Sequence, residues 1–132
     1  MTRSLLRPLT LALLVCALAA AAAPAHAQAA PTVSAAPKPI AFGQILTITG
    51  RGWPVIEFCS RTVRLSLRSA QNVFRIGTVR TRLDGHIRRR WIPRRSEVGA
   101  GQWRLVARMR CESGLDGSPI IQRASTPLRI VP

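Results

Sequence analysis

Apolar and polar residues alternate in three stretches of the chain, strictly in 62–68 and largely in 103–111 and 126–131, which is the pattern of a strand with one buried face. In 62–68 the apolar residues Val, Leu and Leu occupy odd positions, and the polar residues occupy even positions. The same parity recurs in 103–111, where three arginines occupy even positions. In 126–131, Leu and Ile alternate with a single arginine. We therefore predict a half-buried strand in each stretch, with a polar outward side.

Further strand-like runs are separated by turn residues. An edge strand is expected at 32–36, and the β-branched run 44–49 stops at Gly50. No stretch behind the first 27 residues has helical periodicity. About seven short strands with turn signals between them predict an all-β fold, an antiparallel β-sandwich.

Two strand-like runs, 73–83 and 86–92, flank the dipeptide Asp84-Gly85. This dipeptide favours a two-residue hairpin loop, because both residues tolerate positive φ. In the second run Arg89 shares its parity with the apolar residues on either side of it. Either a bulge breaks the register there, or Arg89 lies at the margin of the sandwich and extends to water. We favour the bulge.

The first 27 residues have the three parts of a secretory signal peptide. Arg3 and Arg7 supply a positive start, 11–23 is an unbroken apolar run, and a small-x-small site ends at Ala27. Cleavage is therefore expected after Ala27, and the protein is expected to be secreted or periplasmic. Behind this signal, residues 28–39 form an Ala/Pro-rich stretch, predicted to be a flexible leader. Residues 40–132 form one domain, whose first edge strand may begin near residue 31.

The chain is strongly basic. It holds 20 Lys and Arg residues against 5 Asp and Glu residues, a net charge of +15. Loss of Arg3 and Arg7 with the signal peptide lowers this charge to +13. Such a charge attracts polyanions and disfavours cationic partners. Lys38 is the only lysine, so a genomic bias toward arginine codons is an alternative interpretation of the composition.

A series of short motifs runs through residues 46–105. Residues 46–54 read Leu-Thr-Ile-Thr-Gly-Arg-Gly-Trp-Pro, and 63–65 read Val-Arg-Leu. They are followed by Asp-Gly-His-Ile at 84–87, by Ile-Pro at 92–93 and by Gly-Gln-Trp-Arg-Leu at 101–105. In order and spacing this series resembles the bacterial extracellular immunoglobulin-like domains of the IPT/TIG-like kind. The resemblance implies an immunoglobulin-like sandwich that serves as an adhesive, spacer or ligand-binding module, with no catalytic residue.

Two cysteines, Cys59 and Cys111, remain after signal removal. An even pair in an oxidising compartment most often forms a disulfide. In an immunoglobulin-like sandwich the third and sixth strands are antiparallel neighbours, so the start of one meets the end of the other. We therefore expect a bridge within one sheet that stabilises the fold. The third cysteine, Cys16, lies in the signal peptide; a lipid attachment there is disfavoured by the bulky Val15 before it.

The outward sides of the third, sixth and seventh predicted strands carry arginines. If these strands share one sheet, they form a basic face for polymers that carry phosphate, sulfate or carboxylate groups. The alternative is a solvated surface without a partner. Nucleic acid is the less favoured polyanion, because the face lacks interleaved aromatic residues and no helix is predicted to enter a groove. The predicted residues are Arg64, Arg68, Arg104, Arg108, Arg110 and Arg129.

Catalytic and metal sites are not predicted. His86 is the only histidine after the signal peptide, and with Asp84 it flanks the predicted turn, so a local turn contact explains both residues. The acidic residues are too few and too scattered to supply metal ligands, and no cofactor is expected. The sequence thus predicts an exported, non-enzymatic immunoglobulin-like module of the cell envelope, with a binding or structural role. Its partner would be an anionic envelope polymer or another exported protein. The alternative is a secreted cationic protein that binds nucleic acid or another polyanion.

Overall fold

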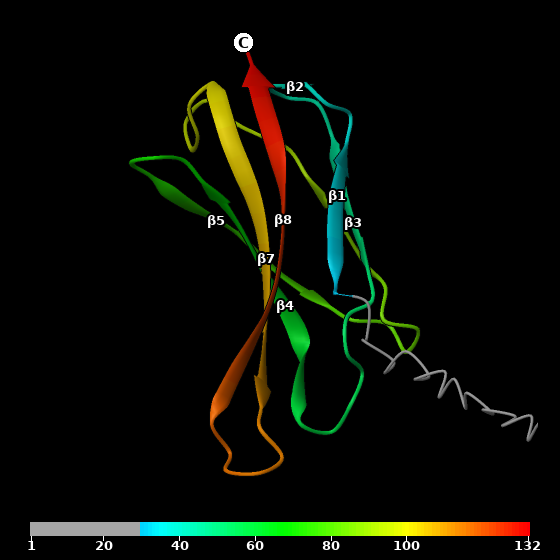
Figure 1. Ribbon diagram of the computed structural model, residues 1–132. Helices are drawn as coiled ribbons and strands as arrows, with labels where there is room; N and C mark the ends of the chain where they lie inside the picture. Colours follow the sequence, from blue (N-terminus) through cyan, green and yellow to red (C-terminus); the bar gives the residue numbers. More distant parts are fainter. Residues whose placement is uncertain (1–29) are drawn as a thin grey trace, which may run out of the picture.

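The computed structural model describes residues 30–132 of the chain (Figure 1). The predicted signal peptide, its cleavage site after Ala27, Cys16 and the first two residues of the predicted leader lie outside the described residues. Within residues 30–132 the secondary structure consists of eight strands, with no helix, which confirms the all-β class. No segment of this part is a helix long and apolar enough to cross a membrane.

The strands form two sheets. A three-stranded sheet has the order β1-β3-β6, and a five-stranded sheet has the order β2-β8-β7-β4-β5. Figure 1 shows β1 and β3 beside each other, in a layer separate from β8, β7 and β4. The strands are β1 (Thr32–Ala36), β2 (Ile40–Ala41), β3 (Leu46–Arg51), β4 (Cys59–Arg68), β5 (Val73–Arg80), β6 (Ile87–Trp91), β7 (Gly101–Glu112) and β8 (Pro119–Val131).

The core lies between the two sheets. In β4, the residues at odd positions from 63 to 67 are buried while those at even positions are half-buried or exposed, as the alternating pattern predicts. The buried side chains of both sheets join in one hydrophobic cluster, so the two layers pack as a sandwich. Its largest members with almost no exposed surface are Trp53, Ile40, Leu46, Ile48, Leu65, Leu67, Ile87, Leu105, Met109, Leu128 and Ile130.

The predicted strands at 62–68 and 103–111 lie within β4 and β7, which are antiparallel neighbours. The last strand is longer than predicted. The sequence suggested 126–131, yet β8 begins at Pro119 and pairs with β7 along its whole length. Within the expected loop 112–121, residues 112 and 119–121 therefore belong to the two strands of a hairpin, and residues 113–118 form the turn between them. In this turn Ser113 N donates to Ser118 O at 2.7 Å. Residues 119–125 do not alternate regularly, and the pairing with β7 rather than a local pattern makes them a strand.

The predicted leader, 28–39, contains β1. Residues of β1 pair with β3, and Val33 and Ala35 are buried in the core, so this segment belongs to the sandwich. The chain then changes sheet, and β2 pairs in parallel with the end of β8. The sandwich thus has eight strands rather than about seven, and one of its pairings is parallel. A two-residue strand such as β2 leaves no periodic pattern in the sequence.

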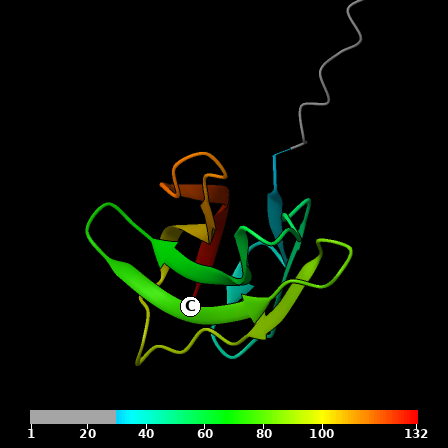
Figure 2. The same ribbon diagram turned by 90° about the horizontal axis from the view of Figure 1, so that it is seen from below.

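The predicted hairpin at Asp84-Gly85 is wrong, because β5 and β6 belong to different sheets. The dipeptide does form a turn, in which Gly85 N donates to Arg82 O and Arg82 N donates to His86 O. The turn carries the chain from one layer to the other, as Figure 2 shows. Trp53 N also donates to Gly85 O, and a Cβ atom on Gly85 would lie 2.7 Å from Trp53 O. Close packing on Trp53, together with a φ of 81°, explains why glycine occupies this position.

The bulge that we favoured in the run around Arg89 is absent. The pairing of β3 with β6 is continuous from Leu46↔Trp91 to Gly50↔Ile87. The irregularity lies instead between β4 and β5, where Leu65 pairs with Gly77 but Ser66 pairs with Arg75. The extra residue of β5, Ile76, is left without a partner. Arg89 lies at the margin of the sandwich, as the alternative interpretation proposed, but its guanidinium group donates to carbonyls of β5 beside this bulge instead of extending to water.

The predicted disulfide between Cys59 and Cys111 is present. The two residues pair directly across β4 and β7, and their Cα atoms are 3.9 Å apart. Both are buried at the edge of the hydrophobic cluster. Beside the bridge, Glu112 N donates to Phe58 O at 2.8 Å. The bridge therefore lies within the five-stranded sheet and fixes the loop before β4 to the β7–β8 hairpin.

Candidate functional site: an arginine-bearing sheet face

The three strands expected to share a basic face are neighbours in the order β8-β7-β4. Arg64 pairs with Arg108, which in turn pairs with Arg123, so that three guanidinium groups project from one row across three strands. Arg68 pairs with Arg104 in a second row. Side chains on the same side of directly paired residues are neighbours in a sheet. The register thus brings four of the six predicted arginines together near the middle of the face.

The other two predicted residues lie toward the ends of the same face. Arg110 pairs with Ile121 beside the hairpin turn, and Arg129 pairs with Gln102 at the opposite end. Both are exposed and keep the even parity of β7 or the matching parity of β8. The face therefore extends beyond the central group. We call this outward side of the β5, β4, β7 and β8 strands the arginine face; besides the central four arginines it carries Arg110 and Arg129.

The arginine face contains three residues that the sequence analysis missed: Arg75, Arg80 and Arg123. Arg75 pairs with Ser66 and Arg80 pairs with Thr62, on the outward side of β5. They were missed because the Asp-Gly signal assigned this run to a hairpin with the next run, rather than to the edge of β4. Arg123 was missed because the last strand was expected to start only at residue 126.

Acceptors for these arginines are scarce. The only carboxylate with the outward parity of β7 is Glu112, the last residue of that strand. Within residues 30–132 the one ion pair is that of His86 with Asp84, in the turn between the sheets. Arg104 Nη1 donates to Ser125 Oγ at 3.1 Å, a neutral acceptor. Glu57 and Glu112 line a hollow with Arg110 at one end of the face, but among the described residues neither forms an ion pair with an arginine. The arginines of the face outnumber these carboxylates, so the face keeps a positive potential.

A hollow of about 340 Å³ lies in the arginine face between β4, β5 and β7. Ser66 and Gly77 form part of its lining, beside the irregular pairing of β4 with β5. The Nε atom of Arg68 is buried and has no hydrogen-bond partner within the described chain. The guanidinium groups that line it come from three different strands: Arg64 and Arg68 from β4, Arg75 from β5 and Arg108 from β7.

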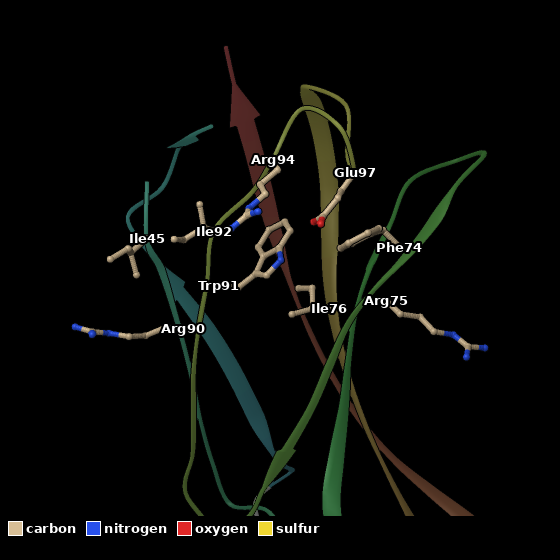
Figure 3. Close-up of a pocket in the computed structure, with 9 residues that line it drawn as sticks. All are labelled: Ile45, Phe74, Arg75, Ile76, Arg90, Trp91, Ile92, Arg94 and Glu97. Carbon is tan, nitrogen blue, oxygen red and sulfur yellow. The ribbon is translucent and has the colours of Figure 1, made fainter. Parts of the chain in front are cut away.

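A second, larger cleft of about 700 Å³ opens between β5 and β6, the edge strands of the two sheets. Figure 3 shows Trp91 and Phe74 in its centre, and their ring centroids are 5.9 Å apart. Arg94 and Glu97 lie at one end of the cleft, whereas Arg75 points away from Trp91 (Figure 3). The direction of Arg75 agrees with its place in the arginine face. Both aromatic rings pack against the core, while the cleft is also lined by four charged residues, Arg75, Arg90, Arg94 and Glu97.

Arg89 connects the two edge strands. Its Nη1 atom donates to Thr78 O, and its Nη2 atom lies 3.5 Å from Ile76 O. These carbonyls flank Gly77, the residue after the unpaired one in β5. The guanidinium group thus satisfies two backbone acceptors of β5, which as an edge strand has a neighbouring strand on one side only. It also places a positive charge directly behind the hollow.

Asp84 and His86 form a local contact in the turn between the sheets. His86 Nδ1 lies 2.7 Å from Asp84 Oδ2, and His86 N donates to Asp84 Oδ1 at 3.0 Å. The hydrogen bond from the His86 side chain holds the pKa of Asp84 below its ordinary value. Both cysteines are joined in the disulfide and offer no thiolate. The described residues contain no group of His, Cys, Asp and Glu that could hold a metal ion.

Comparison with known proteins identifies no family for this chain. No family model and no curated protein matches the chain. Among solved structures, murine CRIg aligns with 77% of this chain and 98% of its own, at 12% identity and a TM-score of 0.43. A similarity at this level carries no argument about ligand or activity.

Proposed function

We propose that this protein is an exported, non-enzymatic immunoglobulin-like module that binds an anionic polymer of the cell envelope through the arginine face. The observation that carries the proposal is the register of β4, β7 and β8, which places Arg64, Arg108 and Arg123 side by side without a carboxylate between them. Guanidinium groups bind phosphate, sulfate and carboxylate groups through paired hydrogen bonds.

The sheet order supports the immunoglobulin-like assignment. In seven-stranded immunoglobulin domains the first, second, fourth and fifth strands share one sheet, while the third, sixth and seventh share the other. Here β1, β3 and β6 form one sheet, and β4, β7 and β8 lie together in the other. The arrangement departs from that pattern at β5, which pairs with the edge of β4 instead of joining the three-stranded sheet. The bridge within one sheet differs from the inter-sheet disulfide of antibody domains. Membership of the IPT/TIG-like family is also part of this proposal, and it rests on the motif series in residues 46–105.

Disulfide bonds persist in oxidising compartments, so the Cys59–Cys111 bridge supports a secreted or periplasmic location. A structural role without a ligand is the alternative to polymer binding. A non-enzymatic role is supported by the local pairing of Asp84 with His86 and by the use of both cysteines in the bridge. Nucleic acid is the less favoured polymer because no aromatic side chain stands among the arginines of the face.

Two fourfold Arg→Ser variants test the proposal. The first removes Arg64, Arg68, Arg104 and Arg108 from the face. The control removes Arg51, Arg88, Arg90 and Arg94, of which three lie on the three-stranded sheet and all are exposed. Both variants lose four charges, so the long-range attraction to a polyanion falls by a similar amount. The face variant should therefore lose more affinity for the polymer than the control does.

The readout is binding to heparin, polyphosphate and double-stranded DNA over a series of NaCl concentrations. For the parent we expect binding that weakens with salt, and for the face variant about a tenfold greater loss of affinity than for the control. Circular dichroism and thermal melting check that both variants fold. Equal losses in the two variants, or a parent that binds none of these polymers at physiological salt, would contradict the proposal. Preference for DNA over both other polymers would favour the nucleic-acid alternative.

A further inference from the structure

We propose that the hollow between β4, β5 and β7 binds a tetrahedral oxyanion, the sulfate or phosphate ester group of the polymer. This inference rests on the proposed function, because it identifies the chemical group that the arginine face would recognise. It adds that recognition is concentrated at one place, defined by Arg64, Arg68, Arg75 and Arg108.

The backbone around the hollow explains why a depression exists on an otherwise continuous sheet. The pairing shifts between Leu65 and Ser66, so that one extra residue is accommodated in β5 opposite β4. Bulges bend the strand and redirect neighbouring side chains. Gly77 adds no side chain beside the shift, and the small side chain of Ser66 lies between Arg64 and Arg68. The lining of the hollow thus combines small residues beside the register shift with four arginines.

Arg68, which lines the hollow, has a buried Nε donor without a hydrogen-bond acceptor. This Nε atom has no accessible surface and no hydrogen-bond partner among residues 30–132. A buried donor without a partner costs free energy, and the cost is larger when the donor belongs to a charged group. The other lining side chains are arginines, apolar groups and two hydroxyls, so the hollow offers Arg68 no carboxylate. Because Nε has no accessible surface, an anionic oxygen in the hollow can accept from it only after the Arg68 side chain turns toward the hollow.

The directions from which the arginines approach favour a tetrahedral anion. One guanidinium group suffices to bind a planar carboxylate through two parallel hydrogen bonds. Here arginines from three strands line one hollow, and such an arrangement suits an anion whose oxygens point in several directions. Arg89 adds a further positive charge behind Gly77, where its Nη2 atom would lie 2.8 Å from a Cβ on that residue. The volume of about 340 Å³ accommodates one ester group with part of its sugar.

The test uses the exported protein and three free anions: sulfate, inorganic phosphate and acetate. NMR of the arginine side-chain Nε–H groups follows each titration at constant ionic strength, with NaCl as the reference. We expect saturable shifts of the Arg68 signal with sulfate or phosphate, and no saturation with acetate. Shifts that are linear in concentration, or equal for all exposed arginines, would overturn the inference.

Conservative variants separate the hollow from the rest of the arginine face. Arg68→Lys keeps the charge but removes the planar donor group. Arg129→Lys makes the same change in the arginine face outside the hollow, and Arg88→Lys makes it on the three-stranded sheet. Sulfate affinity should fall about tenfold in R68K and should not change in R88K. Ser66→Asp places a carboxylate within the hollow, so it should abolish saturable sulfate binding and raise the melting temperature. Equal affinity in R68K and R88K, or undiminished binding in S66D, would refute the site even if one variant were less stable.

Polymer binding measured on the same variants distinguishes this inference from the proposed function. If the parent binds heparin or polyphosphate but R68K and R129K lose affinity equally, the inference fails and the proposed function stands. If the parent binds neither polymer while free sulfate saturates the hollow, the proposed function fails and only the oxyanion site stands. Tighter binding of heparin than of polyphosphate assigns the group to a sulfate ester, and the reverse order assigns it to a phosphate.

Discussion

At the scale of single residues, Gly77 is a position in one sheet that an arginine of the other sheet, Arg89, approaches closely. Its φ of 143° is a conformation that residues with a side chain rarely adopt. A Cβ atom there would meet the Arg89 guanidinium group, which donates to the neighbouring carbonyl of Thr78. The glycine thus permits both the bulge in β5 and the approach of Arg89 from β6.

We predict that Gly77→Ala lowers the free energy of unfolding by about 1–3 kcal/mol, because the backbone is strained and Arg89 must move. Gly99→Ala is a suitable control, since a Cβ there meets nothing within 4 Å and its φ is not positive. Urea unfolding of both variants measures the difference. A Gly77→Ala variant as stable as the control would show that Arg89 is not held at this position in solution.

At the scale of elements, the β7–β8 hairpin projects beyond the three-stranded sheet, as the lower part of Figure 1 shows. Its residues toward the turn include the exposed Ile120 and Ile121, which no strand of the other layer covers. The Cys59–Cys111 bridge joins β4 to this hairpin near the place where the second layer ends. The bridge thus holds a part of the sheet that has less core packing than the rest.

Removal of the bridge by Cys59→Ala with Cys111→Ala should lower the free energy of unfolding by about 2–4 kcal/mol, as expected for a closed loop of this length. The sequence separation of the two cysteines is 52 residues. The loss should be accompanied by faster amide hydrogen exchange in residues near the hairpin turn, relative to the centre of β7. Unchanged stability, or exchange that rises evenly over the whole sheet, would contradict a role in holding the hairpin. Thiol labelling of the denatured, unreduced parent provides the control and should find no free cysteine.

Comparison of the predicted and observed elements shows which information the sequence carried. Alternation was sufficient for β4 and β7, because each has one face on the core and one in solvent. Together with the resemblance, this parity also anticipated the bridge and six residues of the arginine face. The sequence did not show which strand the chain joins after the Asp84-Gly85 turn, since a tight turn can close a hairpin or carry the chain between sheets. Packing on Trp53 decides between them, and it involves residues some thirty positions earlier in the chain.

The same limit explains the incomplete prediction of the site. Arg75 and Arg80 could be placed only once β5 was known to pair with β4 rather than with β6. The hollow depends on a register shift of one residue, which arises from pairing between strands and has no signature in either strand alone. Periodicity thus predicts which side of a strand faces solvent, whereas the neighbours on that side follow from tertiary pairing.

At the scale of the whole molecule, basic residues are spread over both sheets but concentrated on one. The three-stranded sheet exposes Arg51, Arg88 and Arg90, and the described residues contain a single ion pair. The proposed polymer belongs to the cell envelope, so the protein meets it only after export across the membrane. The signal peptide prediction therefore bears directly on the proposed function.

We predict that the mature protein begins at Gln28, because the small-x-small site ends at Ala27 behind an apolar run. Intact mass and N-terminal sequencing of the protein recovered from the culture medium or periplasm measure this. A variant with Ala25 and Ala27 replaced by bulky residues is the control, and it should accumulate as the uncleaved precursor. Retention of the first 27 residues in exported parent protein, or a lipid on Cys16, would show the prediction to be wrong.

The row formed by Arg64, Arg108 and Arg123 has a consequence for the geometry of a bound polymer. Neighbouring strands are about 4.8 Å apart, whereas successive outward residues along one strand are about 6.8 Å apart. A chain lying across the strands would therefore meet charges at a shorter interval than a chain lying along them. The sheet therefore presents its outward residues at two different spacings, one across the strands and one along them. The spacing of anionic groups in a polymer selects the direction in which the polymer lies.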